Sequence, residues 1–378
     1  MLTHKQKSAG VKLKVLIVNL QGRIAGAETS LLLLLEFIKN CRFTVACPAG
    51  NKLAEKIADL DCDVNQISPP PAKSFRSLAG LLYLIRLNLQ LTAIVLKTKP
   101  QIIHANSTKA ALASTMPALL LRKKLIWHVR DLQRPTLAAK LCSLISKKII
   151  AVSKTVKKSL IEQGIDPSRI KIIYNGTSIK KTQPVTQRKI KNKKFVFANI
   201  GQFVPWKKQP LFIDAARLFL NKNKNAHFLL IGEDIYQRNG KYQKSLMQKI
   251  KKEFPSKKIT CLKWRDNLEK LWCRIDCLIH TAENEPFGRL IIEAMANNVI
   301  VIAANNAGPA EIIKNNKHGL LVQPDNPEKL SLAMAKIANN KQFAIKMALA
   351  GKKHVLKKFS AKKTAEQIEN LYQILFTN

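Results

Sequence analysis

The chain has 378 residues, 46% of them hydrophobic, and a formal net charge of +41. This length exceeds what one ordinary hydrophobic core holds together and predicts about two domains, and the apolar content excludes an intrinsically disordered chain. The charge predicts an anionic partner, which can be nucleic acid, an anionic membrane face or an acidic substrate.

The character of the basic residues favours a membrane surface or a phosphorylated ligand over nucleic acid. Lysine far outnumbers arginine, and the sequence shows no Arg-rich or aromatic cluster and no recognisable nucleic-acid-binding module. A solvated, Lys-rich surface without an anionic partner is the plain alternative. We therefore expect an anionic membrane surface among the partners and no nucleic acid.

Two features of the sequence predict a cytoplasmic protein. The polar N-terminus, M-L-T-H-K-Q-K-S-A-G, precedes a predicted strand and is unlike a signal peptide. The seven cysteines are odd in number and form no C-x-x-C, which predicts free thiols without a disulfide framework or a zinc site. We expect a cytoplasmic protein that can attach peripherally to the inner face of the cell membrane.

The first half of the chain alternates short apolar runs with helical segments. Strands of four to six apolar residues between helices predict a parallel sheet covered on both faces. The predicted strands are 14–19, 43–47, 102–105, 125–129 and 148–152, and the predicted helices are 28–39, 53–59 and one from about residue 108.

The most hydrophobic stretch, residues 78–96, carries Arg86, Asn88 and Gln90 in its middle. A central arginine is costly inside a bilayer, so this composition favours a core helix over a membrane span. A helix lying in the plane of the membrane is the alternative.

Residues 180–194 interrupt the alternation. They carry seven Lys or Arg and no Asp or Glu, which predicts an exposed basic linker. We therefore predict two α/β domains, at 1–179 and 195–360, with a last helix at 361–378 that packs toward the first domain. The second half is expected to have strands at 195–201, 227–231, 259–263, 277–280 and 300–303, and helices at 209–219, 241–254, 268–273, 289–296 and from 327.

Site residues are expected in the loops that follow strands, because open parallel sheets bind ligands beyond the carboxyl ends of their strands. In the first half these loops contain Q-G-R-I-A-G-A-E with Gly22 and Gly26, H-A-N-S-T with Asn106, and W-H-V-R-D. His128 ends a strand, where its side chain can reach a ligand. A hydrogen-bonded structural histidine, and an Arg130 that simply pairs with Asp131, are the plain alternatives.

In the second half, the loop G-Q-F-V-P-W-K-K-Q offers Lys207 as a cation that can neutralise a leaving diphosphate, although it can also be an ordinary surface lysine. The segment E-N-E-P-F-G-R-L-I-I-E-A-M-A places Glu285 in a loop and Glu293 in the helix behind it. Backbone N–H groups at a helix start suit phosphate, and carboxylates suit sugar hydroxyls. Two unrelated glutamates are the alternative interpretation.

One metal-binding pattern is set aside. The segment Asp61-Cys62-Asp63 has the D-x-D form of metal-dependent sugar transferases, but it lies between a helix and the next apolar segment and not in a post-strand loop. We expect no metal site and no cofactor.

These segments, in this order, resemble the family 4 retaining glycosyltransferases over about residues 13–325. The strongest match is E-x-P-F-G-R-L-I-I-E-A-M-A followed by A-G-P-A-E-I-I and H-G-L-L-V, and A-V-S-K…Y-N-G-T is also typical of the family. The resemblance implies the GT-B architecture of two Rossmann-like domains whose parallel sheets face each other across a cleft. It also implies sugar transfer from a nucleotide-diphospho-sugar to an acceptor, with retention of configuration and no essential metal. Because the charge of +41 suits an anionic membrane, we expect the acceptor to be a cell-envelope glycan or a lipid-linked glycan.

The resemblance also implies roles for the site residues, with the first domain binding the acceptor and the second domain the donor. Glu293 would hold the donor ribose, Glu285 the transferred sugar, and Lys207 the diphosphate, while His128 would lie near the reacting hexose. The remaining donor-side residues would be Gly26, Gln202, Arg265, Phe287 and Gly288, and the acceptor-side residues would be Asn106 and Arg130.

Gln202 stands where the family often has arginine, which removes one fixed charge from the phosphate site; Lys207 or Lys208 would compensate. In addition, N-N-V-I-V replaces the usual G-x-P-V turn, which we interpret as a tolerated structural change. The departure at Gln202 leaves a second hypothesis open: a catalytically impaired protein of the same fold that binds sugar nucleotides or polyanions. A nucleic-acid-binding module is the third, and it predicts salt-sensitive binding to random DNA or RNA.

Overall fold

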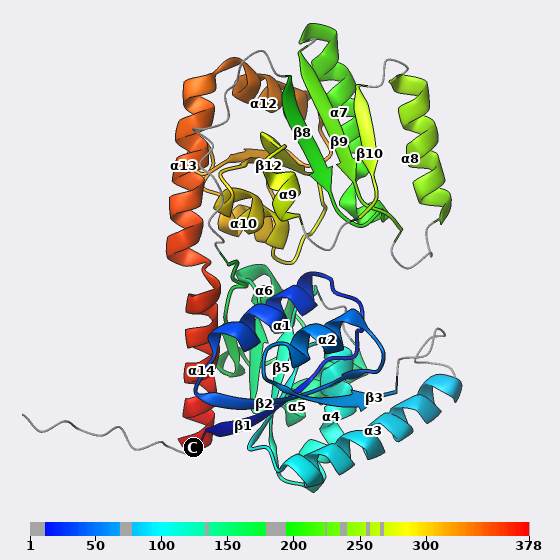
Figure 1. Ribbon diagram of the computed structural model, residues 1–378, viewed down its shortest axis with the longest axis vertical. Coiled ribbons are helices and arrows are strands. Elements are labelled where there is room, and N and C mark those ends of the chain that lie inside the picture. The colour runs from blue at the N-terminus through cyan, green and yellow to red at the C-terminus, as the bar shows by residue number, and fades with distance from the viewer. Residues whose placement is uncertain are drawn as a thin grey trace, which may run out of the picture. The chain divides into compact units, whose positions relative to one another are not determined.

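The computed structural model describes residues 12–68, 78–132, 136–178, 194–223, 225–234, 240–254, 258–264 and 268–377. The chain divides into two units, and each has its own parallel sheet (Figure 1). The first unit comprises Met1–Val152, Val156–Ile173 and Ala361–Asn378, and the second comprises Ser153–Thr155 and Tyr174–Ser360.

The first unit is built on a seven-stranded parallel sheet with the order β3-β2-β1-β4-β5-β6-β7. Its central strands are buried along their whole length or nearly so, as expected for a sheet covered on both faces. The strands are β1 (Leu13–Val18), β2 (Cys41–Pro48), β3 (Asp63–Ile67), β4 (Ile102–Ala105), β5 (Lys124–Val129), β6 (Lys148–Ala151) and β7 (Ile170–Ile172).

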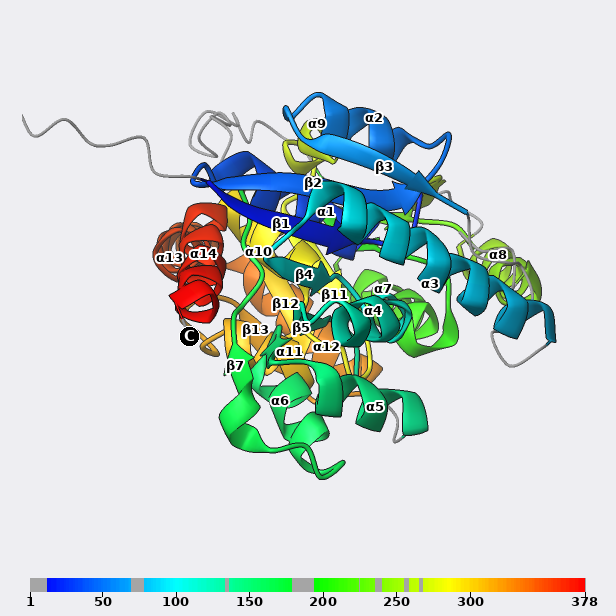
Figure 2. The same ribbon diagram turned by 90° about the horizontal axis from the view of Figure 1, so that it is seen from below.

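Helices cover both faces of this sheet. The helices α1 (Gly26–Phe37), α2 (Lys52–Ala58) and α14 (Ala361–Thr377) share one hydrophobic cluster with β1 and β2. Near α6 (Lys154–Ile161), the helices α3 (Leu78–Thr98), α4 (Thr108–Leu120) and α5 (Leu137–Ile145) lie side by side on the other face (Figure 2). The last helix of the chain therefore completes the core of the first unit.

The second unit is built on a six-stranded parallel sheet with the order β10-β9-β8-β11-β12-β13. Phe197, Phe212, Phe219 and Phe228 pack ring against ring in its core. The strands are β8 (Phe195–Ile200), β9 (Ala226–Ile231), β10 (Ile259–Leu262), β11 (Cys277–His280), β12 (Ile300–Ala304) and β13 (Leu320–Val322). The helices are α7 (Gln209–Lys222), α8 (Gly240–Glu253), α9 (Glu269–Trp272), α10 (Arg289–Ala296), α11 (Ala307–Ile312), α12 (Pro327–Asn339) and α13 (Lys341–Lys358).

The predicted fold class of two Rossmann-like domains with parallel sheets is confirmed. The predicted linker 180–194 lies outside the described residues, except for Lys194. The sequence patterns did not predict the strands β3, β7 and β13 or the helix α5.

The prediction of a core helix at residues 78–96 is only half correct. The helix α3 is buried along one stripe that includes Tyr83, Leu87 and Leu91, whereas Leu81 and Leu89 on the opposite side are more than half exposed. Among the described residues, α3 is the one helix long and apolar enough to cross a membrane, and only 28% of its most hydrophobic window is buried. The helix therefore has two apolar sides, and the fold covers one of them.

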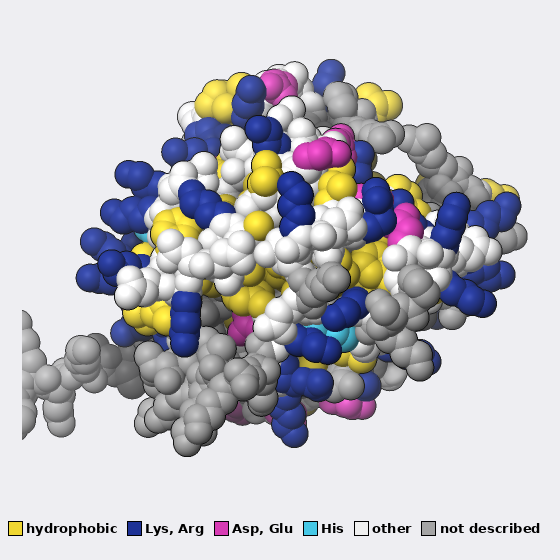
Figure 3. All heavy atoms as spheres, turned by 90° about the horizontal axis from the view of Figure 1, so that it is seen from above, with side chains coloured by type: hydrophobic (Ala, Val, Ile, Leu, Met, Phe, Trp, Pro, Cys, Tyr) yellow, Lys and Arg dark blue, Asp and Glu magenta, His cyan; other side chains and the backbone are white. Residues whose placement is uncertain are grey.

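Lys and Arg side chains are dispersed over the face of the molecule drawn in Figure 3, with few Asp and Glu among them. On this face the positive charge does not gather into a single stripe. This face therefore does not by itself present a single basic binding surface.

Candidate active site

Three neighbouring strands of the second unit end at the same edge of the sheet, and their loops hold the predicted donor-side residues. Because β8, β11 and β12 are adjacent and parallel, the loops that follow them converge at their carboxyl ends. The loops are tied together: Thr281 Oγ1 donates to the backbone oxygen of Lys207 at 2.8 Å, and Gly308 N donates to the backbone oxygen of Glu285 at 2.9 Å.

Lys207 and Glu285 form a nearly buried ion pair at this edge. The Lys207 ammonium lies 2.5 Å from Glu285 Oε2, and the two side chains are 16% and 13% exposed. His280 Nε2 lies 3.4 Å from the same carboxylate oxygen. Burial alone would raise the pKa of Glu285, but the Lys207 charge and the His280 hydrogen bond outweigh it and hold that pKa well below its usual range. Glu285 is therefore a fixed anion with Lys207 as its counter-ion.

Two glycines shape the backbone beside this pair. Gly288 has φ +101°, a conformation that side chains disfavour, and it immediately precedes α10. A Cβ on Gly308 would lie 2.4 Å from the backbone oxygen of Phe287, so only glycine allows the two loops to approach this closely. Phe287 is buried against Tyr174 and Phe359. This packing fixes the start of α10, where the first backbone N–H groups lack intrahelical partners and suit an anion.

Glu293 lies one turn into α10 and pairs with Arg289. Arg289 Nη2 donates to Glu293 Oε1 at 2.7 Å, and the side chains are 11% and 22% exposed. Arg289 Nη1 also donates to the backbone oxygen of Gly176, in the Y-N-G segment, at 3.5 Å. Glu285 and Glu293 are thus held by different cations.

Glu311, in the A-G-P-A-E segment, is also bound by several donors within the second unit. Its Oε1 accepts from the backbone N–H of Thr155 at 2.7 Å, and its Oε2 accepts from that of Lys154 at 2.8 Å and from Tyr174 Oη at 3.2 Å. Glu311 therefore connects the A-V-S-K and Y-N-G segments.

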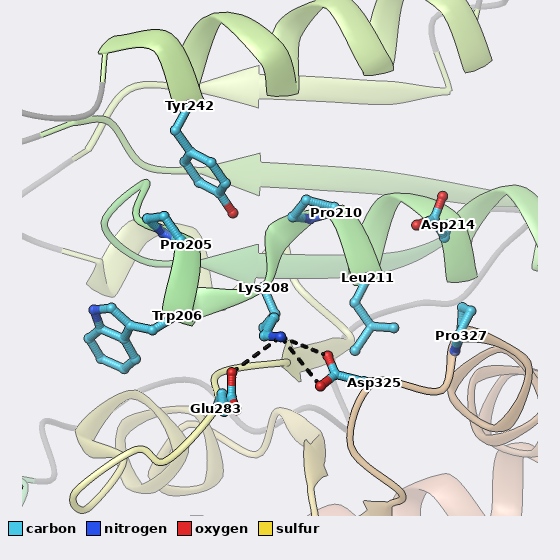
Figure 4. A pocket seen from close by; sticks show the side chains of 10 residues that line it. All are labelled: Pro205, Trp206, Lys208, Pro210, Leu211, Asp214, Tyr242, Glu283, Asp325 and Pro327. Atoms are coloured by element: carbon cyan, nitrogen blue, oxygen red, sulfur yellow. Dashed lines mark hydrogen bonds and ion pairs between the residues drawn. The ribbon is translucent and has the colours of Figure 1, made fainter.

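Lys208 forms ion pairs with other residues than Lys207 does. Its ammonium lies 3.2 Å from both Glu283 and Asp325, and these three residues line a hollow of about 560 Å³ with Trp206 (Figure 4). The backbone of Lys208 is left-handed at φ 53°, which is strained for a side-chain-bearing residue. With Lys208 bound to two carboxylates, Lys207 is the better candidate to compensate for the missing arginine at position 202.

The loop at Gly26 is already capped from within the first unit. Gly26 is the first residue of α1, and Glu28 Oε2 accepts from the backbone N–H of Ala25 at 3.1 Å. Burial raises the pKa of Glu28, partly offset by its backbone hydrogen bonds and the charge of Arg130. The carboxylate makes this helix start less suited to a diphosphate than the sequence pattern alone indicates.

His128 belongs to a buried chain of hydrogen bonds in the first unit. His104 Nε2 lies 3.1 Å from His128 Nδ1, and Tyr372 Oη of α14 lies 2.5 Å from His104 Nδ1. Arg130 Nη2 lies 3.4 Å from His128 Nδ1. Because a guanidinium can only donate, His128 Nδ1 accepts, and in a neutral ring the proton is then on Nε2.

The same reasoning gives the direction of the other two hydrogen bonds in this series. His104 donates to His128, and Tyr372 donates to His104. Burial and then the charge of Arg130 lower the pKa of both histidines, that of His104 to about 3, so both rings are neutral. His128 Nε2 has no hydrogen-bond partner among the described residues, although it is buried. Because buried polar groups are usually hydrogen-bonded, His128 Nε2 is a candidate donor to a ligand or a water.

The two predicted acceptor-side residues contact each other. Asn106 is 1% exposed, and its Oδ1 accepts from Arg130 Nε at 3.0 Å and Nη2 at 2.7 Å, while its Nδ2 donates to Asn19. Asn106 therefore positions Arg130. Arg265 lies outside the described residues.

Two family profiles match this chain one after the other. The profile described as Glycosyltransferase Family 4 matches residues 24–181, and that described as Glycosyl transferases group 1 matches residues 181–354. The chain belongs to the family 4 glycosyltransferases. A glycosyltransferase of this type uses a nucleotide sugar.

Two relatives of this glycosyltransferase are named for the transfer of different sugars. It is 32% identical to the alpha-1,3/1,6-mannosyltransferase of Mus musculus over 187 residues. This match covers 47% of this chain and 45% of that protein. It is 22% identical to the UDP-Gal:alpha-D-GlcNAc-diphosphoundecaprenol alpha-1,3-galactosyltransferase of Escherichia coli, over 98% of this chain and 100% of that protein. The chain thus spans less than half the length of the first relative and all of the second.

Among solved structures, HepE of Anabaena in complex with UDP and glucose has the same fold. The TM-score is 0.83 at 23% identity, and the match covers 96% of this glycosyltransferase and 99% of HepE. At this identity the likeness supports the architecture of two Rossmann-like units.

Three polar residues of the candidate site were not picked out individually from the sequence. His280 ends a strand, as His128 does, so the same pattern could have identified it. Arg289 lies four residues before Glu293 in a helix, the spacing of an ion pair. Glu311 gives no such signal, because its partners lie more than 130 residues away. The D-x-D residue Asp63 pairs with Arg42.

Because the buried histidines are neutral, we predict that the stability of the first unit falls at acidic pH. Because folding lowers the pKa of His104 to about 3, the unfolded state binds more protons below pH 6.5, and stability falls as the pH drops. Between pH 6.5 and 5, His104 alone should remove about 2 kcal/mol from the free energy of unfolding of the first unit. Denaturant unfolding at both pH values should show this loss in the wild type and a smaller loss in His104→Asn. Parallel pH dependences of the two proteins would contradict the assignment.

Proposed function

We propose that the protein transfers a sugar from a nucleotide-diphospho-sugar to a glycan or lipid-linked acceptor, with retention of configuration and without an essential metal. The observation that carries this proposal is the Lys207–Glu285–His280 cluster beside the start of α10, with Glu293 one turn further along. A fixed cation, helix N–H groups and two held carboxylates are the groups that a diphosphate and a set of hydroxyls require.

In this proposal each donor-side residue has one task. Lys207 stabilises the diphosphate, Glu285 and the backbone of Phe287 and Gly288 bind the transferred sugar, and Glu293 holds the ribose. The named complexes and substrates of two relatives support a uridine diphosphate sugar as the first donor to test, since HepE is seen with UDP and glucose and the Escherichia coli enzyme is named for UDP-Gal.

Retention of configuration follows most simply if the acceptor attacks C1 of the sugar from the same face that the diphosphate leaves. The C1–O bond to the diphosphate breaks, the acceptor oxygen bonds to C1, and the acceptor proton passes to the departing phosphate oxygen. Glu285 is a poor candidate for a covalent nucleophile, because its carboxylate is bound by Lys207 and His280. Charge stabilisation by Lys207 and the N–H groups would make a metal unnecessary.

The acceptor and the location of the protein are proposed together. The Escherichia coli relative is named for a diphosphoundecaprenol-linked acceptor, which supports a lipid-linked substrate here. The net charge of +41 suits a cytoplasmic protein attached to an anionic membrane surface. In this proposal His128 Nε2 and Arg130 contact the substrate from the first unit.

A binding protein without turnover is the second candidate. It is favoured by Gln202 in place of the usual arginine and by the neutralisation of Lys207 by Glu285. Such a protein would bind a donor in calorimetry but release no product.

Product detection across UDP-, GDP- and ADP-sugars, with a membrane extract as acceptor source, separates these two candidates. Formation of a new glycoside with loss of the nucleotide sugar is the expected result. Donor binding without product would favour the binding protein, and the absence of both would contradict the donor site. Activity that persists in excess EDTA is expected if no metal is essential.

A further inference from the structure

The first unit has an apolar surface that no part of the chain described by the structure covers. On α3 the residues Leu78, Leu81, Leu82, Ile85, Leu89 and Leu96 are each at least half exposed. Their spacing of three, four or seven residues puts them on one stripe of the helix, opposite the stripe that packs inward. From Leu78 to Leu96, which are 18 residue steps apart, this stripe runs about 27 Å along the helix axis.

The neighbouring helices extend this surface. On α4, Leu119 and Leu120 are exposed, and on α5, Leu137 and Leu144 are 86% and 73% exposed. The helix α3 packs on α4 and α4 packs on α5, so the three helices form one layer over the sheet (Figure 2). We call the exposed apolar side chains of α3, α4 and α5 the leucine surface. Apolar patches of this extent on a folded protein mark an interaction site.

The charged residues in the segment of the chain that carries the leucine surface are almost all basic. Residues 64–161, which include all three helices, contain seventeen Lys or Arg and one acidic residue, Asp131. The whole chain has 65 Lys and Arg against 24 Asp and Glu, so this segment is far more one-sided than the rest. Exposed cations such as Arg86, Lys97 and Lys140 lie on the same helices.

Apolar side chains fringed by cations match one kind of partner: a bilayer with anionic headgroups. A second copy of this chain would bring two such positive fringes together, and nucleic acid would leave the leucines in water. We propose that the leucine surface lies on an anionic membrane, with α3 in the membrane plane. This inference rests on the membrane attachment proposed above and identifies the surface that makes it.

The inner stripe of α3 explains why the helix lies in the plane and does not span. Tyr83, Leu87 and Leu91 are buried within the first unit, and Tyr83 Oη donates to the backbone oxygen of Ser68 at 3.1 Å. A spanning helix would have to leave this packing and carry Arg86 into the bilayer. A helix in the membrane plane keeps its packing against the first unit. It also keeps Arg86 out of the bilayer core, because Arg86 lies at the edge of the exposed stripe and can reach headgroups.

The test is vesicle flotation with the full chain and no added donor or acceptor. Wild-type protein should float with vesicles of phosphatidylcholine and phosphatidylglycerol and much less with phosphatidylcholine alone. The triple variant Leu82→Gln, Ile85→Gln, Leu89→Gln should lower the bound fraction at least about tenfold, since three apolar side chains no longer enter the lipid. The matched control Leu332→Gln, Leu349→Gln, Ile374→Gln changes equally exposed residues elsewhere and should bind as wild type does.

Equal binding of the triple variant and wild type, or equal loss in the control, would overturn the proposal. A dimer that these leucine substitutions dissociate, without vesicle binding, would overturn it in favour of a second copy. Donor calorimetry on the same variants separates this inference from the proposed function. If the triple variant no longer binds vesicles but keeps its donor affinity, the result supports the leucine surface. If the wild type does not bind the donor, the result contradicts the transferase proposal alone.

Discussion

Replacement of Lys207 by glutamine is expected to lower kcat/KM of the proposed sugar transfer about 10²–10³-fold, the loss typical for one charge-stabilising group in an active site. The effect should fall on kcat, because the diphosphate gains its charge as the C1–O bond breaks. Lys207 is the cation that contacts Glu285 at 2.5 Å and approaches the Trp206 ring at 4.1 Å, so its ammonium is already fixed in position. Steady-state kinetics with varied donor measures both constants.

The ion pair could instead serve only to hold two loops together, and a charge exchange separates the two roles. The double variant Lys207→Glu, Glu285→Lys restores the ion pair with opposite orientation. If the pair is only structural, this variant should regain activity; we expect it to remain inactive. The matched control is Lys208→Gln, which removes the adjacent cation and should change kcat/KM less than threefold, about the effect of a surface ion pair. Thermal unfolding of each variant checks that the loops remain folded.

Substitution of Glu293 by alanine is expected to weaken donor binding about 10²-fold or more, because hydrogen bonds from two ribose hydroxyls to a carboxylate are lost. Titration calorimetry of the nucleotide sugar into the protein measures this loss directly. The nucleotide alone should lose affinity by the same factor, because the ribose belongs to it and the transferred sugar does not.

The control for this prediction is Glu283→Ala, in the loop before α10. Glu283 is 46% exposed and pairs with Lys208, so its removal changes the charge by the same amount without touching the proposed ribose site. Unchanged donor affinity in Glu293→Ala would refute the ribose assignment. Equal loss in both variants would show that net charge, and not a ribose contact, governs the affinity.

The elements most accurately predicted from the sequence are those buried on all sides. The strand β11 and the helix α10 have the predicted bounds, because a four-residue apolar run and an apolar helix behind Gly288 leave few alternatives. The missed strands β3, β7 and β13 all lie at sheet edges. An edge strand pairs on one side only, and β3, D-V-N-Q-I, accordingly lacks a continuous apolar pattern.

The candidate site was predictable as a set of residues but not as a set of contacts. The Lys207–Glu285 pair joins residues 78 positions apart and depends on β8 lying next to β11, an adjacency that no local pattern encodes. The left-handed backbone of Lys208 was also unexpected, since lysine disfavours that conformation. Asn106 was predicted to bind the acceptor, and only its contacts with Asn19 and Arg130 reveal that it holds another side chain.

The helix α14 has a consequence for the order in which this protein is made. Ala365, Ile368, Leu371 and Leu375 belong to the core of the first unit, and Tyr372 donates to the buried His104. During translation, residues 12–173 therefore emerge with a sheet whose one face lacks part of its cover. Domains usually fold in order of synthesis, but here the first half cannot finish folding until residues 361–377 have left the ribosome. Loss of residues 361–377 would accordingly destabilise the half of the protein that was translated first.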